Sequence, residues 1–177
     1  MSTEQVNDGR SDPRQAICGA LQDVLGLLMA LDSIQYQETG MRGFSSSIGA
    51  HTRHCVDHVD ALLLGLSEGE IRYDRRERGT QIEHELEFAI SAIRDRQVQL
   101  GALSTDLLEC KVRVAALVTA DSGEKRFRSS GEREALYVFH HTVHHLALMA
   151  SQAAQMGISM DGTVGRAPAT IAADLAH

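Results

Sequence analysis

Apolar residues recur at spacings of three and four along most of this chain, which is the period of amphipathic helices. The first such stretch follows Asp12-Pro13, a helix start with aspartate as N-cap and proline at the first helical position. Its apolar positions run from Ile17 to Ile34. We expect this helix to end near Gly40, because glycine suits the position just after a helix.

Two further helices are predicted before residue 102. Residues 45–49 open the second helix, which we expect to end at about Leu66. Residues 68–79 are mostly charged and show no core pattern, so they predict a connection. Thr80 and Glu83 have the spacing of a capping box and predict the start of a third helix, which ends near Gly101.

The helical period is lost between residues 111 and 128. Residues 111–118 are rich in valine, residues 119–123 have turn composition, and residues 124–128 follow as a short return strand. We therefore predict a β-hairpin here. Ser129 and Glu132 form a second capping box at the start of the last long helix, which ends near Gly157.

These elements predict an all-α fold, a four-helix bundle with a small β-hairpin before the last long helix. The length of 177 residues suits one domain. We divide the chain into a disordered lead at residues 1–11, the bundle at residues 12–160 and an irregular C-terminal tail at residues 161–177.

Charge and cysteine content narrow the function classes. The 17 basic and 24 acidic residues give a formal charge of −7, which argues against a broad nucleic-acid surface. No apolar run approaches the roughly 20 residues of a membrane span, and we do not expect the polar N-terminus to act as a signal peptide. The three cysteines are far apart and odd in number, which suits a reducing compartment. We expect a cytoplasmic protein without nucleic-acid or membrane partners.

Seven of the nine histidines fall into two clusters on two predicted helices. The second helix carries three on one stripe at the edge of its apolar face, and the last helix carries two pairs at i,i+4 spacing. Such pairs point two imidazoles at one place, but two ligands rarely suffice for a metal. The clusters are His51, His54 and His58, and His140, His141, His144 and His145.

The two pairs on the last helix differ in their surroundings. His140 and His144 share their stripe with Arg133, whereas His141 and His145 lie closer to apolar positions. We therefore predict that His141 and His145 are ligands, and that His140 and His144 support them or line the mouth of the site.

Histidine clusters of this size favour a metal over a purely structural role. A single histidine on an apolar face is more often a satisfied core residue, but each unpartnered buried imidazole costs on the order of 1–3 kcal/mol. A metal or a carboxylate partner offsets that cost. Nitrogen ligands favour Zn, Ni, Fe or Mn over Mg or Ca.

The stretch from Ser47 to His54 and the motif His141-Thr-Val-His144-His145 resemble the histidine motifs of the DinB-like (YfiT-type) metalloenzyme family. The resemblance covers roughly residues 14–157. It departs at residues 146–148, Leu-Ala-Leu, where many members have Arg-Gly-Gln. It implies a four-helix bundle, a homodimer and one divalent metal with water in its open positions. The implied ligands are His54, His141 and His145. His51 and His58 are extra to the family pattern. We expect catalytic or supporting roles for His51, His58, His140 and His144.

Members of this family include thiol-S-transferases and a thiol-dependent isomerase. The resemblance therefore implies a metal-dependent hydrolase or a thiol-S-transferase acting on a small molecule, such as a low-molecular-weight thiol. The alternative is a non-catalytic, stress-associated helical bundle whose extra histidines only buffer metal. Ferritin-like and hemerythrin-like sites need Glu-x-x-His and His-x-x-x-Glu motifs, which we do not find in this sequence.

Overall fold

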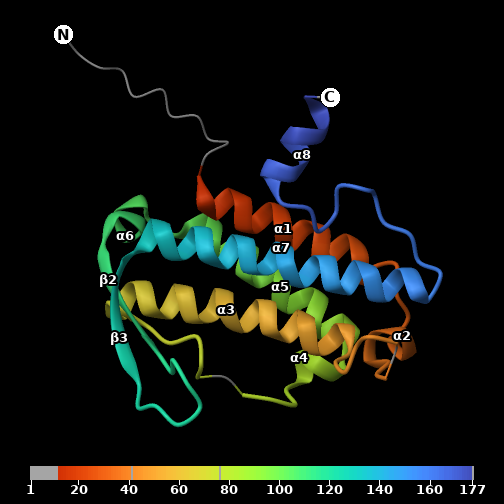
Figure 1. Cartoon of the computed structure of the whole chain (residues 1–177), viewed down its shortest axis with the longest axis horizontal. Coiled ribbons are helices and arrows are strands. Elements are labelled where there is room, and N and C mark those ends of the chain that lie inside the picture. The colour runs from red at the N-terminus through yellow and green to blue at the C-terminus, as the bar shows by residue number, and fades with distance from the viewer. Residues whose placement is uncertain (1–11, 41, 76, 177) are drawn as a thin grey trace.

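The computed structural model describes residues 12–40, 42–75 and 77–176, which form a mainly helical fold with a small three-stranded sheet (Figure 1). The expectation of a mainly helical chain is confirmed, whereas the predicted disordered lead lies outside the described residues. The long helices are α1 (Pro13–Leu28), α3 (Ile48–Glu68), α5 (Leu86–Ala102) and α7 (Gly131–Gln155). The short ones are α2 (Ser33–Gln37), α4 (Gln81–His84), α6 (Thr105–Glu109) and α8 (Pro168–Leu175).

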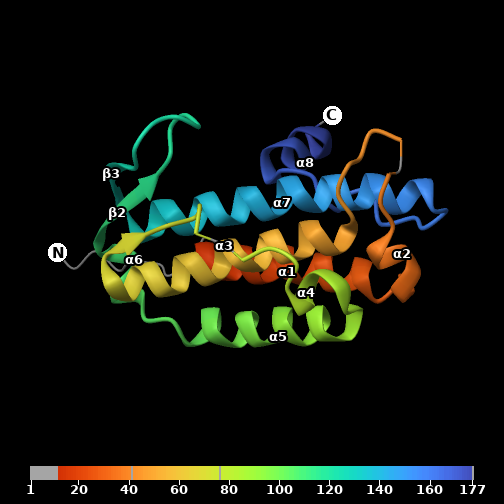
Figure 2. The same ribbon diagram turned by 90° about the horizontal axis from the view of Figure 1, so that it is seen from below.

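The four long helices pack side by side around one core (Figures 1 and 2). Helix α7 contacts α1 and α3, and α5 contacts the same two helices. Leu21, Leu62, Ile93 and Leu146, one from each long helix, are almost fully buried in this core. Burial of each such side chain contributes about 1.5–3 kcal/mol to stability, and this stabilises the α3–α7 interface that carries the histidines.

Among the described residues, no helix combines the length and the hydrophobicity that a membrane span requires.

Helix α1 is shorter than predicted. Asp12 caps it as expected, but it ends at Leu28 and not near Gly40. The reason is a second start signal. The Asp32 side chain accepts the Gln35 backbone N–H, and the Gln35 side chain accepts that of Asp32, a capping box that begins α2.

The predicted third helix is broken into α4 and α5 at Glu85, whose backbone is extended. The predicted capping box at Thr80 is wrong, because its hydroxyl makes no cap bond and has no partner among the described residues. The Glu83 carboxylate is already engaged. It accepts hydrogen bonds from Arg53 Nε at 2.8 Å and from the Gly79 N–H at 3.1 Å.

The sheet contains one strand that the sequence analysis missed. Strands β2 (Lys111–Ala116) and β3 (Lys125–Ser130) pair antiparallel within the region predicted as a hairpin. Strand β1 (Glu70–Ile71) pairs parallel with β2. The prediction that residues 68–79 lack a core pattern is therefore wrong, because Ile71 is fully buried.

The last long helix begins one residue later than its sequence signal indicated. Ser130 caps α7 and accepts the Arg133 backbone N–H, while Ser129 donates its hydroxyl to Glu134. The tail is irregular, as predicted, only up to residue 167 and then becomes helical. It forms α8, which begins with Pro168 in its first turn, a position that tolerates proline because no hydrogen-bond donor is needed there.

Candidate metal centre

Helices α3 and α7 bring five imidazoles into one cluster. Positions 51, 54 and 58 lie on one side of α3, and positions 141 and 145 lie on the side of α7 that faces it. The ring of His54 is central, with centroid distances of 4.4, 4.9 and 4.6 Å to the rings of His58, His141 and His145. The three residues predicted as ligands thus lie together.

Three of these histidines have ligand atoms close enough to hold one metal ion. The ligand atoms of His54, His58 and His141 all lie within 4.8 Å of one another, and the Nε2 atoms of His54 and His141 are 2.9 Å apart. His58 Nδ1 donates to the His54 carbonyl at 3.0 Å. Because Nδ1 makes that bond, Nε2 is the nitrogen of His58 that would serve as a ligand, and three imidazole nitrogens fit a divalent transition metal.

His145 has a different close partner. Its Nδ1 lies 3.0 Å from the Nδ1 of His51. Burial lowers the pKa of both imidazoles, and the nearby histidines, His141 first, lower the pKa of His145 further, to about 3. Both side chains are therefore neutral near pH 7, the form that metal binding requires. The choice of His145 as a ligand remains a prediction.

The other two histidines of α7 lie outside this cluster. His140 is exposed and contacts the ring of Phe139, with centroids 5.0 Å apart. His144 is also exposed, and its ring centroid is 5.4 Å from that of His145. His144 is thus the nearer of the two to the cluster. His140 is a suitable site for control substitutions, because it lies outside the cluster.

A polar cavity of about 390 Å³ opens onto the cluster. Arg53 lines this cavity, and its guanidinium forms ion pairs with Glu83 at 2.8 Å and Asp57 at 2.6 Å. Arg78 has no ion-pair partner among the described residues. A small polar molecule in this cavity would therefore meet imidazoles and one accessible guanidinium. The lining residues are Ser46, Ala50, His51, Arg53, His54, Arg78, Glu83 and His145.

Three residues beside the cluster were not selected from the sequence. The Tyr73 ring stacks on His58, with centroids 5.1 Å apart and planes at 12°, and the Tyr137 ring centroid lies 5.6 Å from that of His141. Tyr73 donates its hydroxyl to Glu134 at 3.0 Å. Burial, and then the Glu134 charge, raise the pKa of Tyr73, so the phenol stays protonated and remains a donor.

Comparison with known proteins adds two findings. Residues 18–149 match the DinB superfamily. A stretch of 102 residues is 29% identical to FK506-binding protein 5 of Rhizopus delemar, which covers 57% of this chain and 26% of that relative. The chain therefore spans only about a quarter of the length of this relative.

Proposed function

The chain belongs to the DinB superfamily, and on that premise we propose that it is a four-helix-bundle protein that binds one divalent transition metal between α3 and α7. The observation that carries the proposal is the approach of three imidazole ligand atoms to within 4.8 Å of one another, from two helices. Without a metal or other partner, bringing so many half-buried imidazoles together would be costly.

His54 and His141 are the ligands on which the resemblance and the geometry agree. The resemblance assigns the third position to His145, and the grouping of ligand atoms favours His58. Three nitrogen ligands suit Zn, Ni, Fe or Mn and leave room for a water or a substrate atom. When bound, such a metal supplies a Lewis acid that lowers the pKa of a coordinated water or thiol.

The cavity of about 390 Å³ is the place for a small-molecule substrate, with a low-molecular-weight thiol as the proposed class. His51 and His145 line it, with their Nδ1 atoms 3.0 Å apart, and as neutral imidazoles they can donate or accept hydrogen bonds to the substrate. Arg78 can bind an anionic group of the same molecule. The proposed reaction is metal-dependent hydrolysis or thiol transfer.

A non-catalytic metal-binding role is the second candidate. It is favoured by the number of imidazoles, because the five histidines of the cluster exceed the three that an open catalytic site needs. Such a protein would buffer or store metal and would not turn over a substrate.

Elemental analysis of protein purified without a histidine tag tests metal binding. We expect about one transition metal per chain in the wild type and almost none in the His54→Ala/His141→Ala double variant. The matched control is His140→Ala/His144→Ala, which removes two exposed imidazoles from the same helix and should keep its metal. Equal metal content in both double variants would refute the proposed site.

A thiol-dependent activity screen then separates the two candidate functions. The metal-loaded wild type is compared with His54→Ala on thiols with electrophiles and on ester and amide panels. Turnover lost in the variant supports catalysis at this centre. No turnover in either protein, together with more than one bound metal per chain, supports the buffering role.

A further inference from the structure

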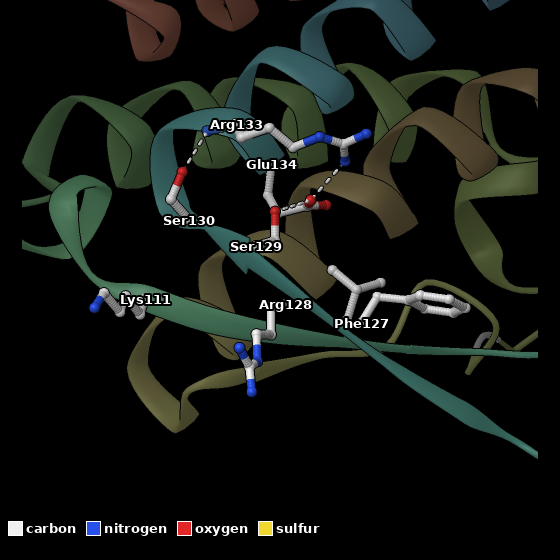
Figure 3. Close-up of a pocket in the computed structure, with 8 residues that line it drawn as sticks. Lys111, Phe127, Arg128, Ser129, Ser130, Arg133 and Glu134 are labelled. Carbon is white, nitrogen blue, oxygen red and sulfur yellow. Dashed lines mark hydrogen bonds and ion pairs between the residues drawn. The ribbon is translucent and has the colours of Figure 1, made fainter.

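Glu134 is a buried carboxylate near the start of α7, with only 1% of its side chain exposed. It accepts three side-chain hydrogen bonds, from Tyr73 Oη at 3.0 Å, Ser129 Oγ at 2.6 Å and Arg133 Nη1 at 2.6 Å. Figure 3 shows the Ser129 and Arg133 bonds converging on this carboxylate. Burial of a carboxylate is costly unless donors surround it, and these three donors offset that cost.

One of the donors connects Glu134 to the histidine cluster. Tyr73 lies 61 residues before Glu134 in the chain, just after β1, and its phenol bonds the carboxylate. The ring of Tyr73 stacks on His58, and His58 stacks on His141 with centroids 3.9 Å apart. A continuous set of contacts therefore runs from Glu134 through Tyr73 to the imidazoles.

The orientation of His58 is what these contacts can control. His58 is 4% exposed, and its Nδ1 donates to the His54 carbonyl. A ring flip would exchange Nδ1 with a carbon and turn Nε2 away from its place. A stacked aromatic ring opposes that flip only if it is itself held, and the phenol bond to Glu134 holds Tyr73. Loss of a group that orients a metal ligand typically lowers metal affinity by about 10–100-fold.

We propose that Glu134 is a positioning residue for the metal centre, because through Tyr73 it keeps His58 in the orientation that presents Nε2 to the metal. The metal in this statement rests on the proposed function, whereas the orientation of His58 is a property of the chain itself. Neither Glu134 nor Tyr73 is one of the residues that would hold the metal.

Glu134 and its partner Arg133 also line a second cavity, separate from the one beside the histidines. This cavity of about 1020 Å³ lies along β3 and the start of α7, and Arg128, Arg133 and Glu134 line it. The Arg133 side chain is 65% exposed, yet it reaches Glu134. Arg128 is exposed in the same cavity but points away from Glu134 (Figure 3). The two arginines thus form a matched pair for substitution.

Nitrogen NMR of the histidine side chains in metal-free protein tests the proposal. We expect the wild type to show His58 in a single tautomer, with the proton on Nδ1. Tyr73→Phe keeps the stacked ring but removes the hydroxyl, and Glu134→Gln removes the charge. Both should give a mixture of His58 tautomers and weaken zinc affinity by about 10–100-fold in chelator competition. Arg133→Gln should act in the same direction to a smaller extent, and Arg128→Gln should change neither measurement.

The outcomes separate positioning from simple stability. If Tyr73→Phe and Glu134→Gln lower the melting temperature but leave the His58 signals as in the wild type, the proposal is overturned. If Glu134→Gln fails to fold, the His58 signals of Tyr73→Phe decide the question. That variant removes only the hydroxyl oxygen that bonds Glu134 and keeps the stacked ring. If the wild type binds no zinc, the proposed function fails, while the tautomer of His58 in the same variants still decides the positioning role.

Discussion

His51 and His145 face each other through their Nδ1 atoms at a distance of 3.0 Å, although 94 residues separate them in the chain. One nitrogen must donate and the other accept, so the contact needs at least one neutral imidazole. Protonation of both rings would place two N–H groups against each other in a half-buried site. The contact therefore makes the α3–α7 interface sensitive to acid.

The free energy of unfolding of the metal-free protein should fall as the pH drops from 6.5 towards about 3. The pKa values of His51 and His145 are lowered in the folded protein, so the unfolded chain binds protons first and is favoured by acid. Well above pH 6.5 both imidazoles are neutral in the folded and the unfolded chain, so they should contribute little pH dependence there.

Urea unfolding at about pH 7.5 and about pH 5 measures this effect. His145→Gln should show a smaller stability difference between the two conditions than the wild type. His140→Gln serves as the control, because His140 is exposed and lies outside the cluster. An unchanged difference in His145→Gln would contradict the prediction.

Substitution of single histidines should identify the third metal ligand. Because the ligand atom of His58 groups with those of His54 and His141, His58→Ala should weaken zinc binding by more than about tenfold, and more than His145→Ala does. Chelator competition with both variants provides the measurement. The opposite order would assign the third position to His145, as the family resemblance implies.

Arg78 should favour anionic ligands in the cavity beside the cluster. In cobalt-loaded protein, mercaptoacetate and 2-mercaptoethanol both offer a thiolate, but only mercaptoacetate adds a carboxylate. Arg78→Gln should weaken mercaptoacetate binding a few-fold, since an exposed ion pair contributes about 0.2–1 kcal/mol, and should leave 2-mercaptoethanol unaffected. Absorption titration reports both affinities. Arg75→Gln, which alters an exposed arginine lining a different cavity, should match the wild type.

Gly49 should tolerate no side chain. A Cβ there would lie 2.2 Å from the Glu83 carbonyl oxygen and 3.0 Å from the Tyr36 ring, because α3 and α4 approach closely. Gly49→Ala should lower the free energy of unfolding by about 1–3 kcal/mol. In contrast, Gly19 in α1 has open space around its Cβ position, and Gly19→Ala should raise stability by about 0.4–1 kcal/mol. Urea unfolding of the two variants compares them directly.

The helical period and the caps were sufficient to predict most of the helical part of the fold. The Asp12 cap and the apolar repeat that follows it are local signals, and α1 begins where they indicate. The helical period alone did not reveal the end of α1, because the apolar spacing continues through Ile34. The capping box at Asp32 begins a new helix, α2, within this stretch. The apolar spacing and the capping box thus give conflicting signals here, and the hydrogen bonds of the capping box determine where the helix boundary lies.

The candidate site was partly predictable for the same reason. Spacing placed the histidines on shared helix faces, but the rotation of α3 against α7 depends on packing, and it brings His58 within reach of His141. Tyr73 was missed because β1 has only two residues, too few for a reliable alternation signal, although Ile71 and Tyr73 do alternate with charged neighbours. The partner strand β2 lies some 40 residues further along the chain.

The exposed turn between β2 and β3 divides the histidines of the cluster into two halves of the chain. His51, His54 and His58 precede this turn, and His141 and His145 follow it. A backbone cut in the turn would yield two fragments, neither of which can form the 2.9 Å contact between His54 and His141. The contact exists only when both fragments dock. The chain therefore has the layout of a split reporter, in which recovery of the imidazole cluster would signal that its two pieces have found each other.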